Sequence, residues 1–309
     1  MIVRAHPRRA ATVAGLAVGA LALAGCGSSG SGSDPAKPQV MASTSAWGSV
    51  AQAVGGNDVQ VDSIVSDPSA DPHSHESSPR EAAQVSKADL VLTNGGGYDE
   101  FVDKVLASSG EPKPTVRAFD SEHEPPEPGE SSANEHVWYD LHAVQEVADH
   151  TADELSKIAP QKAAAFHDSA ARFRAGVGDL QQQVEQIKQQ SQGKKVIATE
   201  PVAHYVLDQA GLDDVTPESF VHAVEDENDP SPEAVAQLQD ALNAHQVSAV
   251  VFNPQTESAV TKQVRDTAQR NQVPVVEMTE TLPPGKDYLQ WMGEQITNLG
   301  TALHQGAPR

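Results

Sequence analysis

The sequence predicts an α/β protein with two parallel-sheet lobes of βα repeats, bridged by one long rigid helix. Two observations support this fold class. Short β-like runs alternate with helical runs in both halves of the chain, as in βαβ units. Between the halves, residues 160–190 carry one amphipathic stripe longer than an ordinary domain helix. We therefore expect an N-terminal lobe at 39–159, a linker helix at 160–192 and a C-terminal lobe at 193–309.

The first half alternates the two kinds of element from residue 39 onward. Ser78 and Pro79 mark a helix start, because Ser is a favoured N-cap and Pro fits the first helical position. Another helix carries Trp47, Val50 and Val54. Strands are expected at 40–44, 59–65, 90–93 and about 115–119, and further helices at 98–107 and 141–158.

The linker helix and the second half continue this pattern. Apolar residues recur in the linker at spacings of three, four and seven: Phe166, Phe173, Val177, Leu180, Val184 and Ile187. At 1.5 Å per residue such a helix is about 45 Å long, which fits a rigid connector. Second-half strands are expected at 195–199, 249–252 and 273–276, and helices near 202–210, 232–244, 257–270 and 287–303.

The N-terminus has the features of an export signal. Three arginines precede an apolar stretch at 10–24 that is too short to span a bilayer. It ends in Leu-Ala-Gly-Cys26, which resembles the lipobox of bacterial lipoproteins, where the cysteine is acylated after cleavage before it. We therefore expect a signal peptide at 1–25, a lipid anchor at Cys26 and a flexible Gly/Ser/Pro-rich tether at 26–38. The alternative is an ordinary secretory signal with a chance cysteine.

The charge of the chain narrows its partners. The formal net charge is −22 at pH 7. Nucleic acid and anionic lipid would be repelled by such a surface, so neither is expected as a partner. Cys26 is the only cysteine, which excludes a disulfide framework.

Residues 120–135 interrupt the α/β pattern. This stretch, DSEHEPPEPGESSANE after Phe119, contains three prolines, many carboxylates and His123. It cannot bury a core face, and we expect a mobile acidic loop.

Candidate functional residues follow the expected strands, where ligands bind in open α/β sheets. Walker A, Rossmann, G-x-S-x-G and H-E-x-x-H motifs are absent from the sequence. The first candidate is His73 in Asp71-Pro72-His73-Ser74-His75-Glu76, where Asp71 could hold one ring nitrogen while the other faces a metal. The alternative is a polar loop with exposed histidines.

The second candidate is His136 in the segment NEHVWYD. Its neighbouring aromatics could exclude water from a bound ion, and the alternative is a histidine satisfied by packing against Trp138. The third is Glu200, at the end of the strand that opens the second half. His204 shares a face with it if the helix has begun, and the alternative is a carboxylate that stabilises a helix N-terminus.

The fourth candidate is Glu280 in Thr-Glu-Thr-Leu-Pro, after the last expected strand. Glu277 and Asp226 are rival ligands, and the alternative is an ordinary loop carboxylate.

Five segments, in order, carry a family resemblance: GGNDVQVDSIVSDPSADPHSHESSP, ADLVLTNGGGYDEF, NEHVWYDL, ATEPVAHYVL and VPVVEMTETLPPGKDYLQWM. They resemble the cluster A-I, or ZnuA/TroA-like, metal-binding proteins of bacterial ABC importers. The similarity covers nearly the whole chain after the tether, and Asp-Pro-His combined with the histidine-tryptophan motif is a specific combination. The resemblance implies two α/β lobes joined by a long helix, in agreement with the periodicity.

The resemblance also implies a ligand set. The family's metal-binding histidines correspond to His73 and His136, and its third ligand, His or Glu, corresponds to Glu200. The last ligand is usually Asp and has no direct counterpart here, so Glu280 is the best candidate. Glu135 replaces the family's usual proline. His75 stands where an aromatic is common, and a relay, a spare ligand and simple exposure remain open for it.

Two imidazoles and two carboxylates suit Zn²⁺ in tetrahedral geometry, and carboxylate oxygens also suit Mn²⁺. Glu at the third ligand position is often a feature of the family's manganese receptors. The acidic loop with His123, however, resembles the His/Asp-rich loops of its zinc receptors. We favour Zn²⁺ as cargo, with a manganese-specific receptor of the same family as the alternative.

The resemblance therefore implies a monomeric solute-binding lipoprotein on the extracytoplasmic face of the cell membrane, which delivers a divalent metal ion to the subunits of an ABC permease. The sequence offers no obvious nucleophile or oxyanion hole, so we expect no enzymatic activity. Two other functions remain as alternatives. One is a surface adhesin or metal-storage lipoprotein, and the other is a zinc hydrolase with Glu280 or Glu200 as general base.

Overall fold

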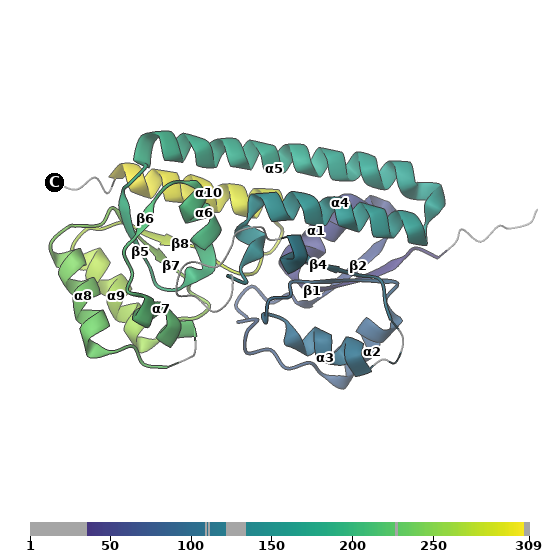
Figure 1. Ribbon diagram of the computed structural model, residues 1–309, viewed down its shortest axis with the longest axis horizontal. Helices are drawn as coiled ribbons and strands as arrows, with labels where there is room; N and C mark the ends of the chain where they lie inside the picture. The colour runs from purple at the N-terminus through teal and green to yellow at the C-terminus, as the bar shows by residue number, and fades with distance from the viewer. Residues whose placement is uncertain (1–35, 109, 111, 122–133, 226–227, 306–309) are drawn as a thin grey trace, which may run out of the picture. The chain divides into compact units, whose positions relative to one another are not determined.

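A computed structural model of the chain, drawn in Figure 1, describes residues 36–108, 110, 112–121, 134–225 and 228–305. The predicted signal peptide, Cys26 and most of the tether lie outside the described residues, as do His123 and Asp226. Residues from Lys37 onward form one compact unit.

The first lobe contains a four-stranded parallel sheet with the order β2-β1-β3-β4. Its strands are β1 (Gln39–Thr44), β2 (Gln60–Val65), β3 (Leu90–Thr93) and β4 (Thr115–Arg117). Every residue of β3 is buried, as expected for a parallel strand with helices on both faces of its sheet.

The second lobe repeats this topology with the order β6-β5-β7-β8, again with all strands parallel. Its strands are β5 (Lys195–Ala198), β6 (Asp213–Asp214), β7 (Ala249–Phe252) and β8 (Val275–Glu277). In both sheets the order reverses beside the first strand, between β1 and β3 and between β5 and β7. Ligands of open α/β sheets bind at such switch points, outside the carboxyl ends of the strands.

The helices begin where their capping residues predict. Ser78 accepts the N–H of Glu81, whose carboxylate accepts the N–H of Ser78, so a capping box opens α2. The helices are α1 (Ser45–Gly55), α2 (Pro79–Lys87), α3 (Glu100–Ser108), α4 (Leu141–Ile158), α5 (Ala163–Ser191), α6 (His204–Gln209), α7 (Glu218–Glu225), α8 (Pro232–Asn243), α9 (Ala259–Arg270) and α10 (Tyr288–Gln305).

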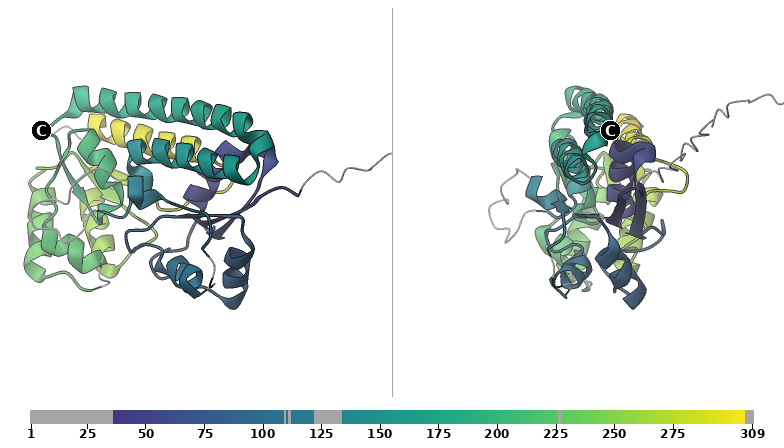
Figure 2. Two further views of the ribbon diagram at one scale, coloured as in Figure 1. Left: turned by 45° about the vertical axis from the view of Figure 1, so that its right-hand side comes forward. Right: turned by 90° about the vertical axis from the view of Figure 1, so that its right-hand side faces the viewer.

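Helix α5 joins the lobes. Figure 1 shows it running above both sheets with α4 and α10 beneath it, and the end-on view in Figure 2 shows these helices bundled on one side of the sheets. Its 29 residues span about 44 Å. The predicted stripe faces inward, with Phe166, Val177 and Val184 buried and Ile187 partly buried. One continuous apolar cluster runs from α1 through α4 and α5 to α6 and α10.

The predicted fold class, two parallel-sheet lobes bridged by a long helix, is therefore confirmed. Smaller apolar clusters lie on the other face of each sheet, under α2 and α3 in the first lobe and under α8 and α9 in the second. Helix α5 packs in one apolar core with both lobes. A close-packed core resists bending of this helix, which supports the expectation of a rigid connector.

Some predicted boundaries were wrong. Strand β4 ends at Arg117 rather than near 119, because the chain turns into a 3₁₀-helix and the N–H of Phe119 bonds to the carbonyl of Asn94. Strand β8 begins at Val275 rather than 273, because the N–H of Val273 still bonds to Ala268 at the end of α9. The short elements β6 and α7 were not predicted.

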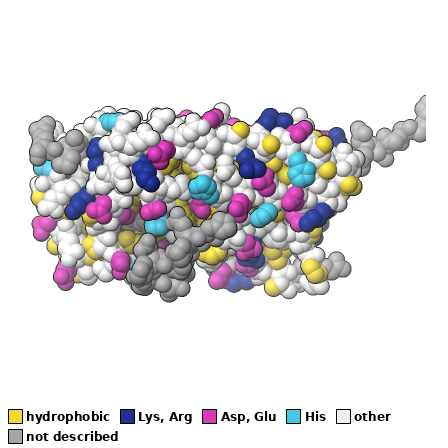
Figure 3. All heavy atoms as spheres, turned by 45° about the horizontal axis from the view of Figure 1, so that its top comes forward, with side chains coloured by type: hydrophobic (Ala, Val, Ile, Leu, Met, Phe, Trp, Pro, Cys, Tyr) yellow, Lys and Arg dark blue, Asp and Glu magenta, His cyan; other side chains and the backbone are white. Residues whose placement is uncertain are grey.

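The surface is mixed in charge. On the face shown in Figure 3, acidic side chains alternate with basic and neutral ones, so negative charge is spread over this face. None of the helices in the described part of the chain is both long and apolar enough to cross a membrane.

Candidate metal centre

A cavity of about 340 Å³ opens between the lobes, at the carboxyl ends of both sheets. It is lined by side chains from both lobes, which is the arrangement that the switch-point rule predicts. The lining includes Asp71, His73, Glu135 and His136 from the first lobe and Glu200, Glu225, Gln255 and Thr256 from the second.

His73 lies in the long loop after β2, and its imidazole lies between two carboxylates. Its Nε2 is 3.6 Å from Oε2 of Glu280, and its Nδ1 is 3.9 Å from Oε1 of Glu135. Oδ1 of Asp71 accepts the backbone N–H of His73 at 2.9 Å. Asp71 was predicted to hold a ring nitrogen of His73. Its carboxylate instead forms an Asx-type turn with the backbone of His73, which shapes the loop.

His136 precedes a short 3₁₀-helix, Val137–Tyr139, and is buried. Oδ1 of Asn134 accepts the backbone N–H of His136 at 2.8 Å and lies 2.7 Å from its Nδ1. Because this oxygen already acts as an acceptor, the shared proton belongs to Nδ1, and Nε2 is left with its lone pair for an ion. The rings of His73 and His136 have centroids 5.6 Å apart.

Aromatic rings wall this side of the cavity. Trp138 packs against His136 with ring centroids 5.2 Å apart and against Tyr98 at 4.7 Å, and Trp138 is fully buried. This packing agrees with the predicted apolar wall beside His136. It also strengthens electrostatic interactions in the centre, because little water reaches them.

Glu280 is fully buried and follows β8. Its Oε2 accepts a 2.7 Å hydrogen bond from Tyr98 of the first lobe, and its Oε1 accepts one of 2.7 Å from Nδ2 of Asn253. Its backbone N–H bonds to Oε1 of Gln255, which fixes the loop that carries it. The carboxylate of Glu280 is thus fixed by hydrogen bonds, whereas the rival candidate Glu277 at the end of β8 is exposed.

Glu200 follows β5 and is nearly buried. One oxygen accepts from Nδ2 of Asn253 and the other from the hydroxyl of Thr256. The side chain of Glu200 accepts no hydrogen bond from the backbone of the following 3₁₀-helix. Its alternative role, as a carboxylate that stabilises a helix N-terminus, is therefore not supported by a capping hydrogen bond. Asn253 thus donates to both carboxylates and holds them as a pair.

Burial sets the protonation of these groups. Burial raises the pKa of Glu200 to about 7, and the charge of Glu280 adds to the shift. Burial likewise raises the pKa of Glu280 to about 7, while the Tyr98 hydroxyl opposes that shift. The pKa of His136 is well below its usual value because of burial. A divalent cation would favour the charged carboxylates, and a neutral imidazole is the form that binds metal.

His73 lies near two other predicted ligands, His136 and Glu280, but in two separate donor groups. One group is His73, Glu135 and His136 and the other is Asp71, His73 and Glu280, and the donor atoms of each lie within 4.8 Å of one another. Glu200 lies in neither of the two donor groups found among the described residues, but it faces the same cavity and shares Asn253 with Glu280.

Other candidate histidines have different surroundings. His75 points toward α2 and α3, with Nε2 3.6 Å from Glu81 and its ring at the edge of Phe101. His204 begins α6, and the lining of the cavity does not include it.

Tyr98 and Asn253 donate to the carboxylates and were not predicted from the sequence. Tyr98 reaches the centre because three glycines with positive φ, Gly95 to Gly97, turn the chain back after β3. A Cβ atom on Gly96 would lie 2.6 Å from the ring of Phe119, so this turn requires glycine. Asn253 had a usable signal, because it is a polar residue directly after the fully buried strand β7.

The chain is similar in sequence to one group of known proteins and in fold to others. The manganese-binding lipoprotein MntA of Bacillus subtilis is 26% identical over 289 residues, which is 91% of this chain and 90% of MntA. The FpvC protein of Pseudomonas aeruginosa, solved with Mn²⁺, superimposes with a TM-score of 0.72 at 18% identity, covering 88% of this chain and 100% of FpvC. The periplasmic zinc-binding protein TroA of Treponema pallidum gives 0.71 at 17% identity, with 88% and 100% coverage.

The family comparison covers most of the chain. Residues 40–302 match the family described as zinc-uptake complex component A, periplasmic. This range includes both sheets, helix α5 and all four residues predicted to bind metal. The chain therefore belongs to the ZnuA family, zinc-uptake complex component A.

Proposed function

We propose that this chain binds a divalent metal ion through His73, His136, Glu200 and Glu280 and delivers it to an ABC permease. Membership of the ZnuA family makes it an extracytoplasmic metal-binding receptor of such an importer. The observation that supports the ligand set is that two imidazoles from one lobe and the buried Glu200 from the other line one cavity, while the buried Glu280 of the second lobe lies beside His73. Opening the lobes would separate the two pairs, which suits capture and release.

Zinc is the proposed cargo. The four donors suit tetrahedral Zn²⁺, and the name of the family describes zinc uptake. Manganese is the second candidate, because half of the donors are carboxylates and the relative MntA is a manganese-binding lipoprotein.

The proposed anchor is a lipid on Cys26, supported by the lipobox-like sequence and by the lipoprotein name of MntA. Cys26→Ser should release the protein from the membrane fraction and abolish incorporation of labelled fatty acid. If the Cys26→Ser variant still incorporates the label, the proposed lipid anchor at Cys26 is wrong, and the proposed metal site is unaffected. We also propose that the receptor is a monomer and catalyses no reaction.

Elemental analysis and calorimetry on residues 39–309 test the ligand set. The unsubstituted protein should bind one ion per chain, and the double variant His73→Ala/His136→Ala should lose it. If about 10–16 kcal/mol of binding is shared by four ligands, each ligand accounts for roughly a hundredfold or more in affinity. Tight zinc binding by the double variant would eliminate the proposed site.

A matched control removes two exposed histidines away from the cavity, His142→Ala/His167→Ala, and should leave affinity unchanged. Turnover of ester, peptide or phosphate substrates by the zinc-loaded protein would favour the hydrolase alternative. Unchanged cellular metal uptake after loss of the protein would favour the adhesin or storage alternative.

A further inference from the structure

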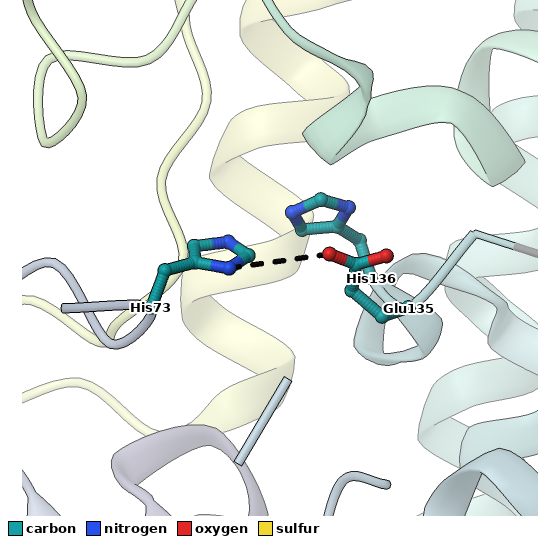
Figure 4. Close-up of side chains that lie close together, drawn as sticks. All are labelled: His73, Glu135 and His136. Carbon is teal, nitrogen blue, oxygen red and sulfur yellow. Dashed lines mark ion pairs between the residues drawn. The ribbon is translucent and has the colours of Figure 1, made fainter. Parts of the chain in front are cut away.

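The two ring nitrogens of His73 face different partners. Its Nε2 is 3.6 Å from Oε2 of Glu280, while its Nδ1 is 3.9 Å from Oε1 of Glu135. The dashed line in Figure 4 marks the ion pair between His73 and Glu135. Two donors about 2.1 Å from one ion lie roughly 3–4 Å apart. Both the Nε2–Glu280 pair and the Nδ1–Glu135 pair have that separation, so the distances leave the choice of nitrogen to the surroundings. Glu280 is fully buried and is a proposed ligand, which assigns Nε2 to the ion and leaves Nδ1 for Glu135.

The nitrogen of a metal-bound imidazole that does not bind the ion almost always donates its proton to a neighbour, which fixes the orientation of the ring. His136 already has such a neighbour, because Oδ1 of Asn134 lies 2.7 Å from its Nδ1. Asp71 also has a carboxylate oxygen within 4.8 Å of a ring nitrogen of His73, but its Oδ1 bonds to the backbone N–H and it belongs to the donor group that contains Glu280. Glu135 is the acidic group that faces Nδ1 of His73.

The backbone of Glu135 is fixed independently of its side chain. Its carbonyl accepts hydrogen bonds from Nδ2 of Asn94 at 2.7 Å and from the N–H of Val137 at 2.8 Å. Asn94 is itself buried and accepts the indole N–H of Trp47 at 3.0 Å. The carboxylate thus extends from a fixed point, and rotation of the side chain alone could close the remaining distance to His73.

We propose that Glu135 is the positioning residue of His73, accepting its Nδ1–H in the metal-bound protein so that Nε2 binds the ion. Adjacent residues then orient the two histidines, with Asn134 holding His136 and Glu135 holding His73. A carboxylate partner also makes the imidazole a stronger ligand than an amide partner would. This inference rests on the proposed function, since it assigns a role in the same centre.

A competing role for Glu135 is direct coordination. Its carboxylate lies within 4.8 Å of donor atoms of both His73 and His136, and a further oxygen ligand would favour Mn²⁺ over Zn²⁺. The two roles predict different responses to substitution. Glutamine keeps an amide oxygen that can accept a hydrogen bond from Nδ1–H, but this oxygen is a poor metal ligand. Leucine can neither accept the hydrogen bond nor bind metal.

The affinities of Glu135→Gln and Glu135→Leu for zinc and for manganese therefore test the proposal. Glu135→Leu should weaken both metals by about 10–100-fold, as loss of an outer partner does, and Glu135→Gln should recover most of that loss for both. Equal losses in the two variants, or a loss confined to manganese, would overturn the positioning role. Glu154→Gln and Glu154→Leu are matched controls, because Glu154 has a similar side-chain exposure, 26% against 24% for Glu135, and pairs with Lys157 on α4, outside the lining of the cavity. These controls should change affinity less than threefold.

A structural readout comes from long-range ¹H–¹⁵N correlation spectra of the zinc-loaded protein. The imidazole of His73 should carry its proton on Nδ1 and the metal on Nε2, and Glu135→Leu should broaden or move its signals. Metal on Nδ1 would overturn the proposal. If the unsubstituted protein binds no metal, the proposed function itself fails. If it binds metal but the variants match the controls, only the role of Glu135 fails.

Discussion

The hydroxyl of Tyr98, in the first lobe, donates a 2.7 Å hydrogen bond to Oε2 of Glu280, in the second. Both side chains are buried, and the two residues are 182 positions apart in the chain. The pKa of Tyr98 is well above its usual value because of burial and the Glu280 charge, so the hydroxyl keeps its proton and acts as a donor. This bond links the lobes through a proposed metal ligand.

We predict that Tyr98→Phe weakens metal binding most strongly at low pH. A buried carboxylate that loses a donor is destabilised by about 1–3 kcal/mol, so the pKa of Glu280 rises further and the ion must displace a more tightly held proton. Zinc affinity should fall about tenfold at pH 6 and clearly less at pH 8.5, as measured by competition with a chelator. Tyr288→Phe is the control, because the buried Tyr288 hydroxyl donates to the carbonyl of Trp138. Identical pH profiles for the two variants would contradict this role of Tyr98.

Asn253 is predicted to act on both carboxylates at once. Its Nδ2 donates to Glu200 and Glu280, so Asn253→Ala should leave two buried oxygens short of a donor, with each carboxylate held only by its other partner. We expect metal affinity to fall about 10–100-fold, measured by calorimetric competition. Asn271→Ala removes an exposed amide that bonds to Asn243 and should leave metal affinity unchanged. An equal affinity for the two variants would contradict the role of Asn253.

Metal binding should release protons at mildly acidic pH. Burial raises the pKa values of Glu200 and Glu280 to about 7, so the folded protein holds these protons more tightly than the unfolded chain does. The stabilisation of the metal-free protein by these groups is present below about pH 4.5 and is lost as pH rises through 7. The affinity for metal should change in the opposite direction and rise between pH 5.5 and 8, because the ion binds the charged carboxylates.

The pKa of His136 lies well below its usual value, so this imidazole stays neutral and adds little to the proton release in that window. Calorimetry in buffers with different ionisation enthalpies should detect released protons at pH 6 and almost none at pH 8.5. An affinity that stays flat from pH 5.5 to 8 would show that the two carboxylates are already charged in the metal-free protein.

The sequence predicted the fold well because each lobe is built from local patterns. The buried strand β3 and helix α4 fall where their apolar patterns place them, and the stripe of α5 shows its buried face directly. The short elements β6 and α7 were not predicted, because the prediction depends on local patterns. Strand β6 is two exposed aspartates, which carry no β pattern, and it forms only because β5 lies beside it.

The candidate centre was predicted less completely. The proximity of His73 and Glu280 follows from strand ends and family resemblance, whereas the part played by Asn253 depends on β5 and β7 being neighbours across a crossover. Asp71 shows the limit of motif reasoning. Its spacing from His73 allowed a bond to the ring, but the backbone N–H two residues on was the nearer donor.

Helix α5 offers a test of the connector that is independent of metal. It contains two glycines, Gly176 and Gly178, in its interior, and glycine costs about 0.8–1.0 kcal/mol relative to alanine there. A Cβ atom on Gly178 meets open space, whereas one on Gly176 would lie 2.6 Å from Cδ1 of Leu289 on α10. Gly178→Ala should therefore raise the free energy of unfolding by about 0.5–1 kcal/mol. Gly176→Ala should give a smaller gain or a loss, because Leu289 must move. Chemical denaturation of the metal-free protein measures both changes. If the two variants gain equally, α10 does not pack against α5 at Gly176 in solution, and the shared core beneath the connector is looser than the structure indicates.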